Sequence, residues 1–258
     1  MLKEVKGLVI RTVDLGESDR LITVFTEKDG VITARARGAR SYKSRKMSAT
    51  LQFCYSDFVL FSATDKFEVR EASLIESFFE IRNSIEGLAL AGYIAEVLDD
   101  VGIATAERDL LRLALNSLYA ISKGKYDLNK IKATFEIRAA AILGFMPDAL
   151  GCSLCGEKHG DFYFDIMAGA MECKTCHAHT EAKRLTISEP HESHIICILT
   201  EGAKDALVFS VYAPLEKVLA YTVSDEDLHL LSRAAEEYLT NHLERSYTAL
   251  KFYNEVKR

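Results

Sequence analysis

Four cysteines in two closely spaced pairs form the clearest chemical pattern in the sequence. Cys152, Cys155, Cys173 and Cys176 spell C-x2-C-x17-C-x2-C. Two residues between cysteines let one tight turn present both thiolates to a single ion, and two such turns complete the tetrahedron that Zn2+ prefers. The segment between the pairs, GDFYFDIMAGAM, combines an aromatic strand-forming run with glycine turns, which is typical of a zinc ribbon. We therefore expect one structural zinc ion on these four sulfurs.

Other interpretations of the cysteines stay open at this point. One pair alone would be a redox-active dithiol, the four sulfurs would be a metal-free remnant, or a nearby histidine would replace one thiolate; the candidates are His159, His177 and His179. Four thiolates fill the usual shell of zinc, whereas a catalytic zinc keeps a position free for water. The metal should therefore stabilise the fold and take no part in a reaction.

A second pattern is a run of positive charge, ARARGARSYKSRK, from Ala34 to Lys46 in a chain of net charge -6. No Asp or Glu occurs between Val31 and Ser56, so we expect the charge of the run to be uncancelled and a polyphosphate to be its partner. Strand alternation places Arg35 and Arg37 on one side. Tyr42 is available to stack on a base. The alternative is a charged, solvated loop without a ligand.

The elements that must position these residues change type along the chain. Residues 1–80 contain several short runs rich in β-branched residues, with an Asp-Gly turn at residues 29–30, which predicts a small barrel or sandwich. From residue 83 onward the apolar spacing is three and four, which predicts helices over 83–102, 107–124 and 127–145. A helix interrupted by Pro214 and one long helix over 224–256 complete the expected elements.

Composition limits the class of protein. With 258 residues, 48% hydrophobic and 27% charged, and only 3 prolines, the chain is long enough for a sizeable core and too ordered to be a linker. Neither a bilayer-length apolar run nor a signal peptide is visible, and paired cysteines suit reduced thiols, so we expect a cytoplasmic protein with no membrane partner. A phosphate-binding loop and a nucleophile elbow are both missing from the sequence, so we expect binding without catalysis.

Several of these segments together resemble one known family. The N-terminal GLVIRTVDLGESDRLITVFTEKDGVITARARGARSYKSR, then LQFCYSDFVLF, FEIRAAAILGFMPDALGCSLCG and the second CKTC, resemble the RecO family of bacterial recombination mediators in its zinc-binding branch. The likeness extends from Gly7 to about Thr180. It implies an N-terminal OB-fold that binds DNA, a central helical region and a zinc element.

The resemblance also implies partners and contacts. RecO proteins bind and anneal single-stranded DNA, bind double-stranded DNA and RecR, engage the acidic C-terminal tail of the single-stranded DNA-binding protein SSB, and with RecR help load RecA onto SSB-coated DNA. A nucleoid-associated location in a bacterial cytoplasm follows from that role. The DNA contacts implied for this chain are seven basic residues: Arg20, Arg35, Arg37, Arg40, Lys43, Arg45 and Lys46.

The site for the SSB tail is less well matched. Many relatives carry arginines directly before the Phe-Glu of the central helix, where this chain has Ala133 and Thr134. The nearest cations are Lys130 and Lys132, and with Phe135 they form the expected tail site. An ordinary amphipathic helix is the alternative.

We therefore expect an α+β multidomain protein: an N-terminal OB-fold barrel followed by a mainly helical domain with an inserted zinc ribbon. The expected boundaries are 1–80 for the barrel, 81–150 and 183–258 for the two parts of the helical domain, and 151–182 for the ribbon. The expected function is that of a DNA repair and recombination mediator. Two alternatives are an OB and zinc-ribbon protein that binds RNA or serves transcription, and a metal-dependent nucleic-acid hydrolase or deaminase.

Overall fold

The computed structural model describes residues 2–62, 66–102, 108–184 and 194–257. The chain divides into two compact units: the first unit is Met1–Lys125 with Tyr247–Arg258, and the second is Tyr126–Ser246. The C-terminal segment therefore belongs with the first half of the chain. This division groups the chain differently from the four segments expected from the sequence, whose boundaries stay predictions.

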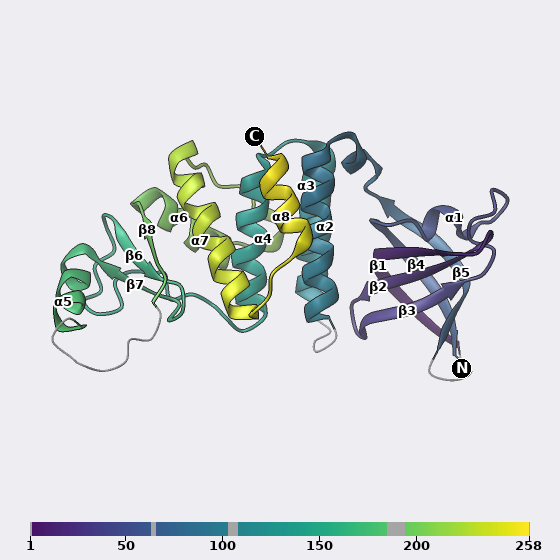
Figure 1. The fold of residues 1–258 in the computed structure, drawn as a ribbon, viewed down its shortest axis with the longest axis horizontal. Coiled ribbons are helices and arrows are strands. Elements are labelled where there is room, and N and C mark those ends of the chain that lie inside the picture. The colour runs from purple at the N-terminus through teal and green to yellow at the C-terminus, as the bar shows by residue number, and fades with distance from the viewer. Residues whose placement is uncertain (1, 63–65, 103–107, 185–193, 258) are drawn as a thin grey trace. The chain divides into compact units, whose positions relative to one another are not determined.

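The first unit begins with five strands, coloured purple to blue in Figure 1. They are β1 (Leu2–Leu15), β2 (Asp19–Thr26), β3 (Gly30–Ala36), β4 (Cys54–Ser62) and β5 (Phe67–Ser77), and a short helix α1 (Lys46–Ala49) precedes β4. The strands form a closed barrel in the order β1-β2-β3-β5-β4, with β4 antiparallel to β1. The seam between β3 and β5 is short, with two parallel residue pairs, Ala34 with Phe67 and Arg35 with Glu68. The expected OB-like barrel is confirmed.

Alternation of side chains explains why these residues form a barrel. Along β3, Ile32, Ala34 and Ala36 are buried in the barrel core, while Arg35 and Arg37 are exposed. The expected Asp-Gly turn joins β2 to β3, with Gly30 at a φ of 62° and paired to Thr26. Because successive side chains of a strand point to opposite faces, one face of each strand lies in the core and the other face can carry charged residues.

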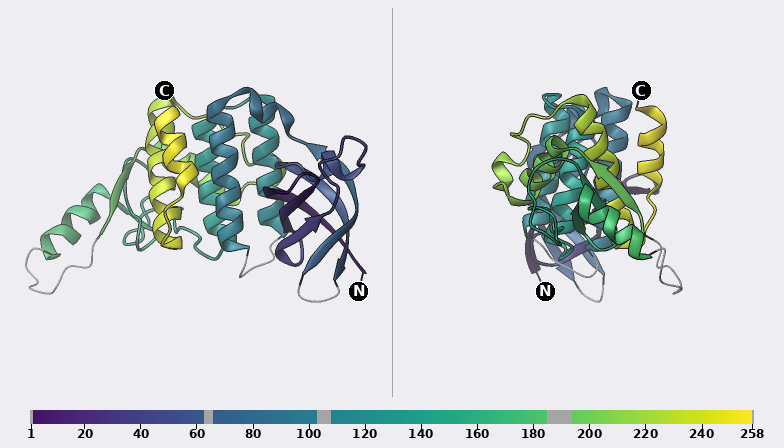
Figure 2. Two further views of the ribbon diagram at one scale, coloured as in Figure 1. Left: turned by 45° about the vertical axis from the view of Figure 1, so that its right-hand side comes forward. Right: turned by 90° about the vertical axis from the view of Figure 1, so that its left-hand side faces the viewer.

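Three helices complete the first unit. They are α2 (Ile85–Val101), α3 (Arg108–Lys123) and α8 (Thr248–Val256), with a 3-10 turn η1 (Phe79–Asn83) between β5 and α2. The Ser84 hydroxyl caps α2 by accepting the N–H of Gly87 at 3.0 Å. Helices α2 and α3 run side by side, and α8 packs on α2 (Figure 1, Figure 2).

The second unit combines helices with a small sheet. Its long helices are α4 (Leu128–Ile142), α6 (Glu201–Tyr212) and α7 (Asp225–Leu243), and α4 packs on both others. The sheet has the order β7-β6-β8, from β6 (Phe162–Asp165), β7 (Ala170–Cys173) and β8 (Ile196–Leu199). Helix α5 (Lys174–Arg184) follows β7 directly (Figure 2). Helix α6 stops before Pro214, followed by the 3-10 turn η2 (Leu215–Lys217), which agrees with the predicted interruption.

The prediction of one helix over 224–256 is wrong. Glu244 adopts the left-handed conformation at a φ of 53°, so α7 ends at Leu243 and α8 begins only at Thr248. No helix in the described parts of the chain has the length and apolar character needed to cross a lipid bilayer.

Candidate metal centre and nucleic-acid interface

The sulfur atoms of Cys152, Cys155, Cys173 and Cys176 lie within 4.8 Å of one another. The Sγ atoms of Cys155 and Cys173 are 3.7 Å apart, close to the roughly 3.8 Å that a tetrahedron with zinc–sulfur bonds of about 2.3 Å requires. The four cysteines expected from the sequence are thus brought together in one cluster that fits a metal ion. None of the three candidate histidines belongs to it.

Local backbone structure explains how each pair is presented. Around the first pair, the N–H of Cys152 donates to Glu157 O at 2.7 Å and the N–H of Gly156 donates to Cys152 O at 2.9 Å. Gly156 has a φ of 78°, a left-handed conformation that favours glycine. The second pair does not lie on a matching loop: Cys173 ends β7, and Cys176 lies in the first turn of α5. The partial positive charge of that helix end favours thiolates.

The thiols of the cluster differ in acidity without a metal. Burial raises the pKa of Cys152, but the backbone N–H groups of Cys173, Leu154 and Cys155 outweigh it and bring the pKa to about 6. Contacts with the sulfurs of Cys155 and Cys173 raise the pKa of Cys176 to about 12. Because a metal-bound cysteine is a thiolate, an ion in this cluster would displace the Cys176 proton at neutral pH, and its affinity would rise with pH.

The barrel carries the predicted basic face. Arg35 and Arg37 point to the same, exposed side of β3, and their side chains are 52% and 64% exposed. Past Gly38, which has a φ of 65°, the chain turns into the loop that leads to α1. The predicted alternation of these two arginines is confirmed.

The expectation that this charge is uncancelled is wrong, because acids from neighbouring strands reach the arginines. Arg35 donates from Nε and Nη2 to Asp19 Oδ2 of β2 at 2.9 and 2.6 Å. Arg40 Nε lies 3.2 Å from Asp14 Oδ2 of β1. Three carboxylates therefore balance much of the basic run, the third being Glu68 of β5, 3.4 Å from Arg37.

Two exposed cations of the run have no carboxylate partner among the described residues. They are Lys43 and Arg45, both exposed on the loop between β3 and α1. The ammonium of Lys43 lies 5.4 Å from the ring centre of Tyr42, a side chain that is exposed. This loop tip combines free positive charge with an accessible aromatic face.

The remaining two predicted contacts are less accessible. The Arg20 side chain is only 11% exposed; its Nε lies 3.1 Å from Asp14 Oδ1, and its Nη1 donates to Thr50 O at 3.4 Å. Lys46 Nζ donates to Val69 O at 3.4 Å. Arg20 therefore ties β2 to β1 and to the end of α1 more than it presents charge to solvent.

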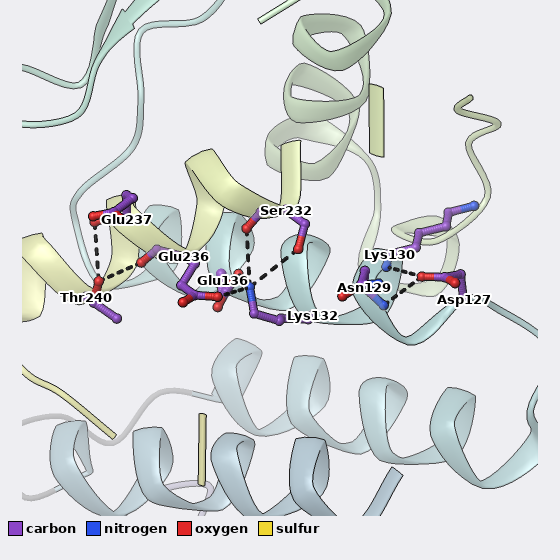
Figure 3. Close-up of polar contacts among 9 residues, drawn as sticks. All are labelled: Asp127, Asn129, Lys130, Lys132, Glu136, Ser232, Glu236, Glu237 and Thr240. Atoms are coloured by element: carbon purple, nitrogen blue, oxygen red, sulfur yellow. Dashed lines mark hydrogen bonds and ion pairs between the residues drawn. The ribbon is translucent and has the colours of Figure 1, made fainter. Parts of the chain in front are cut away.

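The predicted tail site on α4 disagrees with the burial of its residues. Lys132 and Phe135 are both fully buried. The Lys132 ammonium lies 3.0 Å from Glu136 Oε2 and 2.8 Å from Glu236 Oε2 of α7, and it donates to Ser232 O at 3.2 Å (Figure 3). A buried charge with several partners fixes the α4–α7 contact, since removing one partner leaves another uncompensated. A docked tail cannot reach Lys132 or Phe135 in this fold.

Of the three residues of the predicted tail site, Lys130 alone is accessible to a binding partner. Asp127 caps α4 by accepting the N–H groups of Asn129 and Lys130 (Figure 3). The Lys130 ammonium donates to Tyr221 O and lies 4.3 Å from the Tyr221 ring centre and 5.1 Å from that of Tyr126. It borders an open cavity of about 520 Å3 whose other lining residues include Leu219, Val223, Asp225 and Leu228. Burial lowers the pKa of Lys130.

Comparison with known proteins covers nearly the whole chain. Residues 1–78 match the family model for "Recombination protein O N terminal", and residues 82–190 match that for "Recombination protein O C terminal". A protein of Acetivibrio thermocellus named "DNA repair protein RecO" is 35% identical over 254 residues, covering 98% of this chain and 96% of its own. Proteins of the same name from Exiguobacterium sp. and Caldicellulosiruptor saccharolyticus are 28% and 27% identical, over 94% and 98% of this chain and 91% and 98% of their own.

Proposed function

The chain belongs to the RecO family, and from that membership we propose that it is a non-catalytic DNA repair and recombination mediator. Its first task is to bind single-stranded DNA on the barrel face that carries Arg35 and Arg37. The observation that supports this most directly is the loop tip, where the exposed Tyr42 is followed by the unpaired cations Lys43 and Arg45. Phosphates bind the cations and bases stack on the ring.

Charge distribution supports a local mode of binding. Residues 1–80 carry 13 Lys and Arg against 12 Asp and Glu, whereas the other 178 residues carry 19 against 26. An acidic remainder repels the sugar-phosphate backbone, so a strand is confined to the barrel. We further propose that bound strands are annealed there, and that with RecR the protein helps to load RecA onto SSB-coated DNA in a bacterial cytoplasm. Nothing in the loop distinguishes a 2′-hydroxyl, so RNA is the competitor ligand to compare.

Zinc is the ion that we propose for the four-cysteine cluster. All-thiolate sets with two C-x2-C pairs suit a structural zinc, which has no open position for a reacting water. The ion would join the loop before β6 to the start of α5. Because thiolate binding energy is also folding energy, the metal would stabilise this part of the fold.

We propose the cavity beside Lys130 as the place for the SSB tail. The cavity offers one cation between two tyrosine rings and apolar residues such as Leu219 and Val223, which suit an acidic segment with an apolar side chain. Asp127 and Asp225 also line the cavity. They oppose an acidic ligand and limit the affinity to a modest value.

The DNA-binding proposal predicts the effect of removing the two unpaired cations. Lys43→Gln with Arg45→Gln should weaken binding of a single-stranded oligonucleotide and reduce the steepness of log K against log[salt] by about 1.4, because each lost phosphate contact on a single strand contributes about 0.7. Fluorescence anisotropy over a salt series measures both. The control pair Lys28→Gln with Lys251→Gln changes net charge equally and should leave the slope unchanged. If the double variant of Lys43 and Arg45 kept the salt slope and the melting temperature of the unchanged protein, the loop tip would not be the DNA interface.

The zinc proposal predicts coupled loss of metal and stability. Cys152→Ser with Cys173→Ser should abolish bound zinc, and losing even about 3 kcal/mol lowers the Tm by roughly 6 to 12 °C in a protein of this size. Metal content by mass spectrometry and a thermal melt measure the two effects. The control pair Cys54→Ser with Cys197→Ser removes two thiols outside the cluster and should keep the metal. If the first pair kept both metal and Tm, the cluster would not be a zinc site.

The tail proposal predicts a requirement for one ammonium group. Lys130→Ala should weaken binding of an SSB C-terminal peptide about tenfold, since truncating a central cation of a small interface costs about 1.4 kcal/mol. Calorimetric titration measures the affinity. Lys174→Ala on α5 is the control and should bind normally. Equal affinity in both variants and in the unchanged protein would place the tail elsewhere.

A further inference from the structure

Internal pairing divides the basic residues of the barrel into two classes. Lys43 and Arg45 have no carboxylate partner among the residues described. Arg35 and Arg40 instead hold an acid that the chain brings from a neighbouring strand, Asp19 and Asp14 respectively. A phosphate group that approaches Arg35 or Arg40 therefore finds the guanidinium already bound to a carboxylate.

Asp19, which binds Arg35, is held in place by hydrogen bonds to both of its carboxylate oxygens. Its Oδ1 accepts the N–H of Gly38 at 2.9 Å and the hydroxyl of Ser18 at 3.1 Å, and its Oδ2 accepts both Nε and Nη2 of Arg35. Both bonds end on one carboxylate oxygen, and a phosphate oxygen also accepts charge-assisted hydrogen bonds from a guanidinium. Hydrogen bonding by the Gly38 N–H, followed by that from Arg35, lowers the pKa of Asp19 to about 2. The group is therefore charged at neutral pH.

Asp14 serves a second arginine from the adjacent strand. Its two oxygens are divided between Arg40, 3.2 Å away, and the mostly buried Arg20, 3.1 Å away. Arg40 also donates to the carbonyl of Gly16 in the turn between β1 and β2. Both acids thus belong to the ends of β1 and β2 that flank the basic loop.

We propose that Asp14 and Asp19 occupy the anion positions of Arg40 and Arg35, so that DNA binds this face by exchanging a carboxylate for a phosphate. This inference rests on the proposed DNA-binding function and names residues that set its affinity. Unpaired Lys43 and Arg45 make first contact with the strand. Arg35 and Arg40 then transfer to phosphates that the first contacts have brought close.

Magnitudes favour exchange over a permanent internal pair. Solvent-exposed ion pairs change an equilibrium constant by about one- to fivefold. A strand already held by two other contacts presents its next phosphates at high effective concentration, which is enough to displace so weak a partner. The carboxylates therefore lower the affinity without blocking the site, and they recapture the arginines when a strand leaves. A protein that must release strands after pairing them benefits from that reversibility.

The test is removal of one competing charge. In Asp19→Asn the amide oxygen still accepts the Gly38 N–H, but the side chain no longer carries the charge that holds Arg35. Affinity for a single-stranded oligonucleotide should rise about two- to fivefold, and the salt slope should steepen by about 0.7, because one more cation is free to displace counterions. The control Asp29→Asn removes the same charge from the turn after β2 and likewise frees a cation, Lys3, but does so at least roughly 20 Å from Asp19 along the strand, beyond the screening length. It should change neither quantity.

A double variant shows whether Asp19 acts through Arg35. Asp19→Asn should give no gain in an Arg35→Gln background, because the released cation is then missing. A gain that persists there, or an equal gain in Asp29→Asn, would reduce the effect to net charge and overturn the proposal. With the Tm preserved, weaker binding by Asp19→Asn would show that the acid positions Arg35 for DNA, and unchanged binding would show that the ion pair does not affect DNA. Either result would also overturn the proposal.

A fallback variant covers the case in which Asp19→Asn does not fold, and a separate result distinguishes failure of the exchange from failure of the proposed DNA binding. If Asp19→Asn fails to fold, Asp14→Asn tests the same exchange, with a gain expected that disappears in an Arg40→Gln background. Failure of the proposed function itself has a different signature: Lys43→Gln with Arg45→Gln would then bind DNA with an unchanged salt slope. The exchange can fail while that slope still falls.

Discussion

An arginine guanidinium stays charged under all conditions in which a protein is folded, so an exposed arginine cluster needs anions. In this barrel the protein's own carboxylates supply those anions. Asp14 at the end of β1 binds Arg40, and Asp19 at the start of β2 binds Arg35. Arg20 and Arg40 share Asp14, and without that carboxylate their two guanidinium groups would repel each other. If DNA binds this face as we propose, the same pairs make it weaker for DNA than a count of its cations indicates. In that proposal, the ion pairs of the free barrel are also what makes binding reversible.

The second unit solves a different electrostatic problem. A lysine ammonium fully buried between α4 and α7 is tolerable only because two glutamates and a backbone carbonyl surround it. This arrangement explains why Lys132 is structural although its neighbour Lys130, one residue before the buried Ile131, reaches an open cavity. At the small sheet the constraint is the opposite, since four sulfurs that repel one another as thiolates require a cation. The metal we propose there would supply it.

Local patterns in the sequence were enough to predict some of this and not the rest. The spacing of four cysteines and the alternation around Arg35 are properties of short segments, and the structure agrees with them. The partners of the arginines come from β1, β2 and β5, so no window around residues 34–46 contains them. Helix α4 is buried on nearly every side, which leaves no polar stripe to show that Lys132 points inward. No glycine or proline marks the end of α7 at Glu244, so the sequence gives no signal that the helix stops there.

The central claim is that a nucleic-acid strand lies on the loop tip beside Tyr42, and photo-crosslinking tests it most directly. A benzophenone side chain placed at position 42 should crosslink to a single-stranded oligonucleotide, and the crosslink should vanish at high salt. The same probe at the exposed Tyr212 of α6 should give no product. Crosslinking at position 212 with none at position 42 would contradict the account.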